Sequence, residues 1–205
     1  DLAEGKKLLP DPPIASIGYQ ASIVITPQQE ADMDIKATLN NLLIPYTSNY
    51  AGTLLPGIRE YTVTPGEKTT TISGKGKAGL KQEENYYFFY LPVCYKGITG
   101  KSYAYYNTSR SKNLYLPASV DENYSYDIQL PENLTLCTPI QEKKIDNPIG
   151  SFKITLTSEG SSLHIELALQ IKKQLITPAE YPAFRSLITE WTDRTRKPIL
   201  FKTVQ

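Results

Sequence analysis

The sequence predicts a mainly β protein: an antiparallel β-sandwich with one C-terminal helix at about residues 177–193. Three observations lead to this fold class. Several segments alternate apolar and polar residues, which is typical of strands with one solvated face. The 205 residues include 15 Tyr and 15 Pro, and tyrosine suits half-buried strands while proline marks turns. Helical periodicity is convincing in one segment near the end.

Two strands are predicted near the N-terminus. The first has Tyr19, Ala21, Ile23 and Ile25 on one face, and the second has Met33, Ile35, Ala37 and Leu39, with "TPQQEAD" between them. The Gly- and Lys-rich stretch 65–85 favours a long exposed hairpin. We therefore expect one sandwich domain over residues 1–205. Alternatively, the stretch 65–85 is a linker, and the chain consists of two β units that are divided near residues 76–86.

The middle and C-terminal parts continue the β pattern. "NYYFFYLPVC" (85–94) is apolar on both faces, which predicts a central strand. Tyr124, Tyr126, Ile128 and Leu130 share one face of a strand that Pro131 ends. Residues 151–172 alternate on both sides of the turn sequence "SEGSS" and predict a β-hairpin. "ILFKTV" (199–204) reads as a final strand.

The predicted helix has a clear start signal. The sequence has the pattern of a capping box, with Thr177 at the N-cap and Glu180 three residues later. Pro178 would occupy the first helical position. An apolar stripe at helical spacing follows, comprising Tyr181, Phe184, Leu187, Ile188 and Trp191. We expect this stripe to belong to the core, with the helix covering one end or one edge of the sandwich. The alternative is a docking face for a neighbouring domain.

Composition excludes some partners. The formal net charge is +1, from 22 basic and 21 acidic residues without a basic run, which argues against nucleic acid and against an electrostatic membrane surface. No apolar run approaches the ~20 residues of a transmembrane helix. The start "DLAEGKKLLPDPP" lacks a signal-peptide apolar region, so we expect a targeting segment to be absent or already removed.

Catalytic chemistry finds little support in the sequence. A reactive cysteine needs a neighbouring base, and the single histidine, His164, lies on the polar face of a predicted strand. Cys94 and Cys137 follow apolar segments; they could form one disulfide or stay as two buried free thiols. One histidine and two separated cysteines are too few for structural zinc. We expect no catalytic, cofactor-binding or metal-binding residue.

Tyrosine clusters suggest an interaction surface. Tyrosines recur in 86–90, 103–106 and 123–126, and alternate members of such runs must point away from the core. An exposed aromatic row could stack on sugar rings or contact a protein partner. The alternative is that tyrosine fills positions between sheet and solvent. The candidate residues are Tyr87, Tyr103, Tyr105 and Tyr106.

Four segments, in this order, carry a family resemblance. They are "SRSKNLYLP" (109–117), "YSYDIQLPENLTL" (124–136), "GSFKITLTSEGSSLHIELALQI" (150–171) and "ITPAEYPAFRSLITEW" (176–191). Together they resemble the C-terminal domain of unknown function that follows a transglutaminase-like core in bacterial cell-envelope proteins. The resemblance spans about residues 86–205. Residues 1–85 resemble, more loosely, the β region that joins that core to the terminal domain.

The resemblance implies a noncatalytic accessory or interaction domain of a secreted or periplasmic protein. Its partner would be a neighbouring domain or protein of the cell envelope. The Cys, His and Asp of a transglutaminase-like core have no matching segment in this chain, so they cannot be carried over. Two alternatives stay open: a carbohydrate-binding module that uses exposed tyrosines, and a cysteine hydrolase with an unrecognised site, for which Cys94 with His164 is the best pair.

Overall fold

The computed structural model describes residues 13–28, 30–40, 54–94, 98 and 109–204. Its main feature is an eight-stranded sheet in the order β10-β11-β12-β8-β1-β2-β4-β3. All neighbours are antiparallel except β1 and β8, which pair in parallel. The strands are β1 (Ile14–Ile25), β2 (Glu30–Asn40), β3 (Ile58–Pro65), β4 (Thr69–Gly79), β8 (Ser119–Gln129), β10 (Gln141–Asn147), β11 (Gly150–Glu159) and β12 (Ser162–Ile171).

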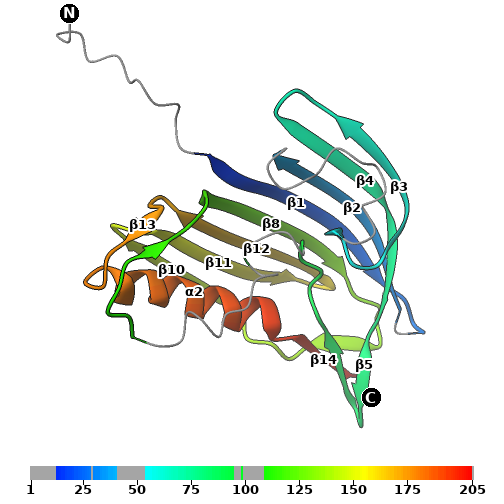
Figure 1. The fold of residues 1–205 in the computed structure, drawn as a ribbon. Helices are drawn as coiled ribbons and strands as arrows, with labels where there is room; N and C mark the ends of the chain where they lie inside the picture. Colours follow the sequence, from blue (N-terminus) through cyan, green and yellow to red (C-terminus); the bar gives the residue numbers. More distant parts are fainter. Residues whose placement is uncertain (1–12, 29, 41–53, 95–97, 99–108, 205) are drawn as a thin grey trace, which may run out of the picture.

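Two smaller sheets and a helix complete the fold. A four-stranded sheet has the order β5-β6-β14-β9, and a two-stranded sheet pairs β13 with β7. The helix α2 (Tyr181–Arg196) lies along one face of the large sheet (Figure 1). The remaining strands are β5 (Lys81–Glu83), β6 (Tyr86–Phe89), β7 (Leu114–Tyr115), β9 (Leu134–Leu136), β13 (Leu175–Ile176) and β14 (Ile199–Thr203).

One continuous core joins these parts, so the predicted mainly β, sandwich-like fold with one C-terminal helix is confirmed. The apolar positions of the alternating segments are all buried, including Tyr19–Ile25 and Leu163–Ile171 at every second residue. Buried residues of α2 and of the small four-stranded sheet belong to the same core. No helix in the described part of the chain has the length and hydrophobicity needed to cross a bilayer.

The helix packs on the face of the large sheet, where it contacts β11 and β12. The expectation that it would cover an end or an edge was therefore wrong in its placement. Trp191 is the anchor: its ring lies 5.7 Å from Tyr124 of β8 and 6.5 Å from Phe152 of β11, between centroids. The other members of the predicted stripe are also buried, which confirms that the stripe belongs to the core.

The start of the helix differs in detail from the predicted capping box. Residues 178–180 form a turn, and the α-helix begins at Tyr181, whose N–H donates to the Thr177 carbonyl at 2.9 Å. The Glu180 carboxylate accepts from the Thr177 N–H at 3.1 Å and from its hydroxyl at 3.0 Å. Half of the box is therefore present. The threonine hydroxyl donates to Glu180 and does not accept from the backbone.

Two strand predictions need correction. The segment 85–94 does form a central strand, β6, between β5 and β14 of the small sheet, but only Tyr86–Phe89 is extended, so the strand is shorter than predicted. The stretch 65–85 is not one hairpin that folds back on itself. Its first strand, β4, pairs with β3 and β2, whereas β5 pairs with β6. The number of domains stays a prediction.

Candidate functional site

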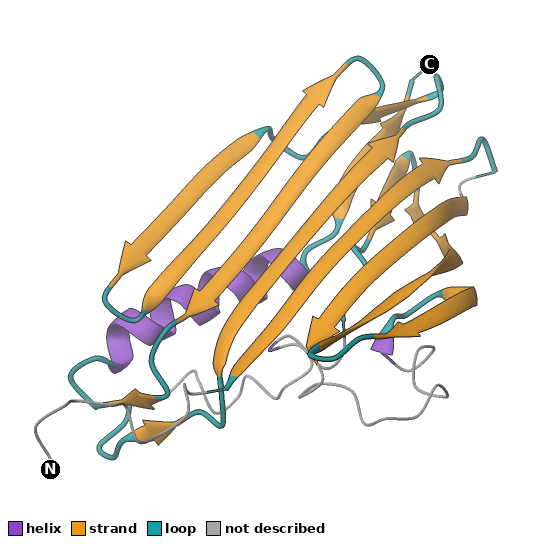
Figure 2. Cartoon of the chain, turned by 90° about the horizontal axis from the view of Figure 1, so that it is seen from above, coloured by secondary structure: helices purple, strands orange, loops and turns teal. Residues whose placement is uncertain are grey.

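The large sheet presents a polar surface on the side opposite α2, which we call the open face. Figure 2 shows this face turned toward the viewer with α2 behind the sheet. It arises from strict alternation, because the residues between the buried ones must point to the other side. Directly paired residues build one polar row across six strands, from β11 to β4: Thr157, His164, Asp127, Ser22, Asp34 and Lys75.

His164 is the centre of a charged network on this face. Its Nδ1 lies 2.7 Å from Asp127 Oδ1, and its Nε2 lies 3.5 Å from Glu166 Oε1. Glu166 in turn forms an ion pair with Lys153 at 3.1 Å. The network spans three neighbouring strands, since β12 carries His164 and Glu166 between Asp127 of β8 and Lys153 of β11.

The network shifts two ionisation equilibria. The hydrogen bond to Asp127 is the largest cause that raises the pKa of His164; burial opposes it, and the weaker hydrogen bond to Glu166 adds to the rise. The pKa of Glu166 is lowered, first by its hydrogen bond to Lys153 and then by that to His164. Both shifts favour the charged forms. The two carboxylates therefore stabilise the protonated form of His164 relative to the neutral form.

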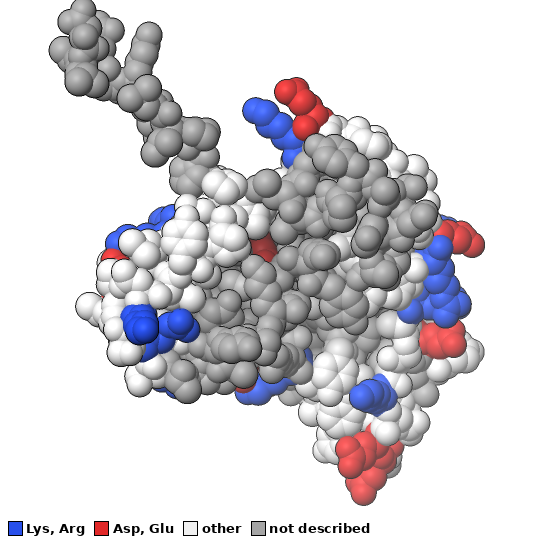
Figure 3. Space-filling model, in the orientation of Figure 1, with Lys and Arg blue, Asp and Glu red and all other residues white. Residues whose placement is uncertain are grey.

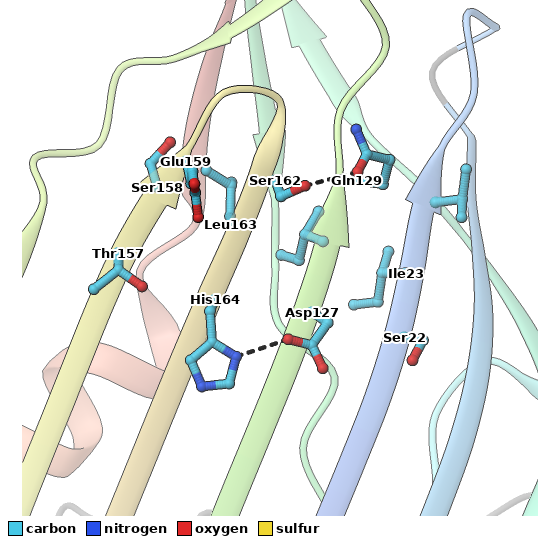
Figure 4. Close-up of a pocket in the computed structure, with 12 residues that line it drawn as sticks. Ser22, Ile23, Asp127, Gln129, Thr157, Ser158, Glu159, Ser162, Leu163 and His164 are labelled. Carbon is cyan, nitrogen blue, oxygen red and sulfur yellow. Dashed lines mark hydrogen bonds and ion pairs between the residues drawn. The ribbon is translucent and has the colours of Figure 1, made fainter.

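A shallow hollow of about 670 Å³ lies beside His164, between β11, β12, β8 and β1. Figure 4 shows the imidazole of His164 turned toward Asp127, and Ser162 bonded to Gln129 further along the same strands. The Ser162 hydroxyl donates to Gln129 Oε1 at 2.9 Å. The polar side chains that line the hollow are mostly hydroxyls, amides and carboxylates. Such groups can form hydrogen bonds with a polar surface of another molecule or domain.

The predicted alternative of a Cys94–His164 pair is wrong. Cys94 is buried on the α2 side of the sheet, where it lies close enough to Tyr19 and Tyr124 to influence their ionisation. His164 lies on the open face, and both of its ring nitrogens face carboxylates. The sheet itself separates the two side chains. No cluster of three metal-ligating side chains occurs among the described residues.

Neither Cys94 nor Cys137 forms a disulfide. The alternative of two buried thiols is correct for Cys94, which is buried. Cys137 is exposed, which that alternative did not anticipate. The reason is that Cys137 follows directly after β9 at the edge of the small sheet, where its N–H donates to the Leu200 carbonyl of β14 at 2.8 Å.

Of the four tyrosines predicted to form an interaction surface, the structure describes one, Tyr87. Tyr103, Tyr105 and Tyr106 lie outside the described residues. Tyr87 is 5% exposed, so its prediction as a surface residue was wrong. All four residues of β6 are aromatic, so its sequence lacks the alternation of apolar and polar residues that would show which side faces the core. The outward side chains are those of Tyr86, which is 38% exposed, and, just after the strand, Tyr90, which is 47% exposed.

Sequence reasoning also missed a buried carboxylate. Glu122 of β8 is 2% exposed, and it accepts hydrogen bonds from the Ile98 N–H and, at 3.1 Å, from the Tyr124 hydroxyl. The Tyr126 hydroxyl donates to the Pro92 carbonyl at 2.7 Å. Burial raises the pKa of both tyrosines. These bonds attach the backbone at Pro92 and Ile98 to the core face of the sheet, which is a structural role.

Charges of both signs are scattered over the molecule. Figure 3 shows small groups of basic and acidic side chains on the side drawn, without one large patch of a single sign. On the open face Lys77 pairs with Asp32 at 3.1 Å and with Glu30 at 3.4 Å. These pairs raise the pKa of Lys77. A surface of mixed sign is more typical of a protein contact than of a polyanion contact.

Comparison with known proteins places this geometry in a family. A crystal structure of a putative protease from Parabacteroides distasonis is similar, with a TM-score of 0.51 and 30% sequence identity. The similarity covers 60% of this chain but 24% of that protein, so the matched part makes up about a quarter of that protein's length. No match is found among curated proteins. The family described as "Domain of Unknown Function with solved-structure structure" (DUF3858) matches residues 85–201. Because this match spans more than half of the 205 residues, the chain belongs to the DUF3858 family.

Proposed function

We propose that this chain is a noncatalytic accessory domain of a longer secreted or periplasmic protein that carries a transglutaminase-like core. The observation that carries the proposal is the unequal coverage of the similar crystal structure, 60% of this chain against 24% of that protein. A domain that forms a minor part of a longer protein commonly serves the rest of it. Residues 86–205 resemble a domain that follows a transglutaminase-like core. This resemblance is the reason why we propose such a core as the neighbouring domain.

The open face is the surface that we assign to contact with that neighbour. It offers hydroxyl, amide and charged groups of both signs, which is the usual composition of contacts between domains within one chain. His164, Asp127 and Glu166 stand near its centre. The described helices and strands leave this face uncovered (Figure 2). A neighbouring domain would find its polar partners there without any rearrangement of the sheet.

An immunoblot of native cell fractions tests the accessory role. An antibody raised against this chain should detect a band much larger than 23.0 kDa in the envelope fraction. A band near 23.0 kDa, or a band confined to the cytoplasmic fraction, would contradict the proposal. The activity of the longer protein should then be compared with and without this domain, because an accessory domain alters the activity but does not supply it.

Charge reversal on the open face tests the assigned surface. Glu166→Lys with Asp34→Lys should weaken binding of this chain to the separately expressed remainder of the longer protein, measured by titration calorimetry. Both residues lie on the open face. The control Glu132→Lys makes one change of the same kind at an exposed residue of the turn between β8 and β9, outside the strands of the large sheet. Equal affinities for the reversed and control chains would refute the assignment.

Glycan binding is the second candidate function, and Tyr86 and Tyr90 favour it. Both rings are exposed on the outer side of the small sheet, and each has a lysine nearby: Lys202 Nζ lies 6.0 Å from the Tyr86 ring centroid, and Lys81 Nζ lies 5.4 Å from that of Tyr90. Retention on immobilised cell-envelope glycan should then fall when both tyrosines are replaced by alanine. Tyr61→Ala on β3, also exposed, is the control. Failure of the wild-type chain to be retained would end this alternative.

A further inference from the structure

A second hollow, of about 470 Å³, lies on the outer side of α2. Its walls come from Pro178 and the first ten residues of α2, from β10 and from the segment before β7. The lining side chains that matter here are Ser109, Arg110, Tyr181, Arg185, Thr189 and Glu190. The hollow is separate from the open face, because it borders the helix that covers the opposite side of the sheet. It also contains none of the exposed tyrosines of the small sheet.

Two guanidinium groups border this hollow. The Cζ atom of Arg110 lies over the Tyr181 ring, 5.8 Å from its centroid, which is a cation–π contact. Arg185 follows Tyr181 by four residues and so lies on the same side of the helix. Arg185 is exposed and forms no ion pair with any residue in the described part of the chain. Its positive charge is available to a ligand.

The carboxylates near this hollow already have cationic partners. Glu190, which lines the hollow, forms an ion pair with Lys143 of β10 at 2.6 Å. Glu180, at the start of the helix, is paired with Lys173. Glu190 and Glu180 therefore do not neutralise Arg185, which lines the hollow together with Arg110.

The walls of the hollow are held in a defined position. The Asn147 side-chain amide, at the end of β10, donates to the Ala183 carbonyl of α2 at 3.1 Å. The same side chain accepts from the Ile149 N–H at 2.9 Å. The end of β10 and the first turn of α2 are thus tied together. The two walls formed by β10 and α2 are therefore fixed relative to each other before a ligand binds, which limits the ordering cost of binding.

We propose that this hollow binds an oxyanion, the carboxylate or phosphate group of an acidic ligand, between Arg110 and Arg185. Guanidinium groups present planar pairs of N–H donors that match the oxygens of both groups. The hydroxyls of Ser109 and Thr189, which line the same space, are further donors. This site would give the domain a ligand of its own, and the inference does not depend on the proposed function.

Titration followed by NMR tests the site in the full 205-residue chain. Sodium phosphate and sodium succinate are added separately at constant ionic strength. We expect saturable shifts of amide signals at 109–110 and 181–190. Arg185→Gln and Arg110→Gln should each weaken binding about tenfold, since one charge-assisted contact is lost. Arg59→Gln removes the same charge from exposed β3 and should leave the affinity unchanged.

The outcomes separate the sources of the oxyanion. Saturation by phosphate alone assigns a phosphoryl ligand, saturation by succinate alone assigns a carboxylate ligand, and saturation by both supports a general oxyanion site. Arg185→Lys should keep part of the affinity, because charge remains but the planar pair of donors is lost. Shifts that do not saturate, or equal weakening by Arg59→Gln, would overturn the proposal.

Discussion

At the scale of single residues, His164 shows how neighbouring side chains set a protonation state. It is the only histidine of the chain, so its titration can be followed by NMR without ambiguity. We expect its midpoint above the usual value of about 6.5, because Asp127 is the main cause that raises its pKa. Asp127→Asn should lower the midpoint more than Glu166→Gln. An unchanged midpoint in Asp127→Asn would contradict the assigned pair.

The sign of the effect on stability follows from that shift. Because the folded-state pKa of His164 is raised, its interactions stabilise the fold fully below the unfolded pKa. That stabilisation is lost as the pH rises through the folded value. Glu166 behaves in the opposite way, because its pKa is lowered. Both side chains are well exposed, so each effect should stay below about 1 kcal/mol.

Trp191 should contribute far more to stability than any charged residue on the open face. It is fully buried between Tyr124 and Phe152, so Trp191→Ala would leave a large cavity and lower the free energy of unfolding by about 3–5 kcal/mol. Urea unfolding followed by circular dichroism measures this change. The exposed Thr189→Ala on the same helix should change it by less than about 0.5 kcal/mol. Similar losses for both would mean that the helix does not pack as described.

At the scale of elements, the start of α2 depends on the ionised form of Glu180. Hydrogen bonds from Lys173 and Thr177 lower the pKa of this carboxyl to about 2. Its contribution should therefore be complete above the usual glutamate pKa and disappear as the pH falls toward 2. Glu180→Gln should lower the melting temperature at pH 7 and match the wild type near pH 2. A difference that does not depend on pH would contradict this role.

The pairing of β11 with β12 depends on a glycine. A Cβ atom at Gly150 would lie 1.8 Å from the Gln170 carbonyl oxygen, so Gly150→Ala must displace a backbone. We expect a loss of at least about 1–3 kcal/mol in the free energy of unfolding. Gly79→Ala is the matched control, because a Cβ atom at that strand position meets nothing within 4 Å. Equal tolerance of the two alanines, measured by urea unfolding, would show that β11 and β12 are less closely paired.

At the scale of the whole molecule, the order of strands sets which parts open first. Strand β8 lies between β12 and β1 with both neighbours paired along its length. Strand β3 forms an edge, and most of its side chains are exposed. Hydrogen exchange should therefore be slowest in β8 and β1 and more than tenfold faster in β3. Equal protection of β3 and β8 would mean that something covers this edge.

Local patterns account for what the sequence by itself determined. The alternating segments around residues 19–25, 124–130 and 151–172 became strands with the predicted faces buried, and the apolar stripe of 181–191 became a buried helix face. These features depend on residues two to four positions apart. Burial of apolar side chains is a strong driving force, so a periodic pattern of them specifies which side of an element faces the core.

Only the tertiary structure decided which elements meet. Strand β1 pairs in parallel with β8, about a hundred residues later, and the aromatic segment 86–89 joins β14 in a second sheet. The orientation of Tyr87, the burial of Glu122 and the separation of Cys94 from His164 all follow from such pairings. Contacts between distant segments depend on register and on competing partners, which leave no periodic trace in the sequence. The open face and the hollow beside α2 are formed by these contacts between segments that are distant in the sequence.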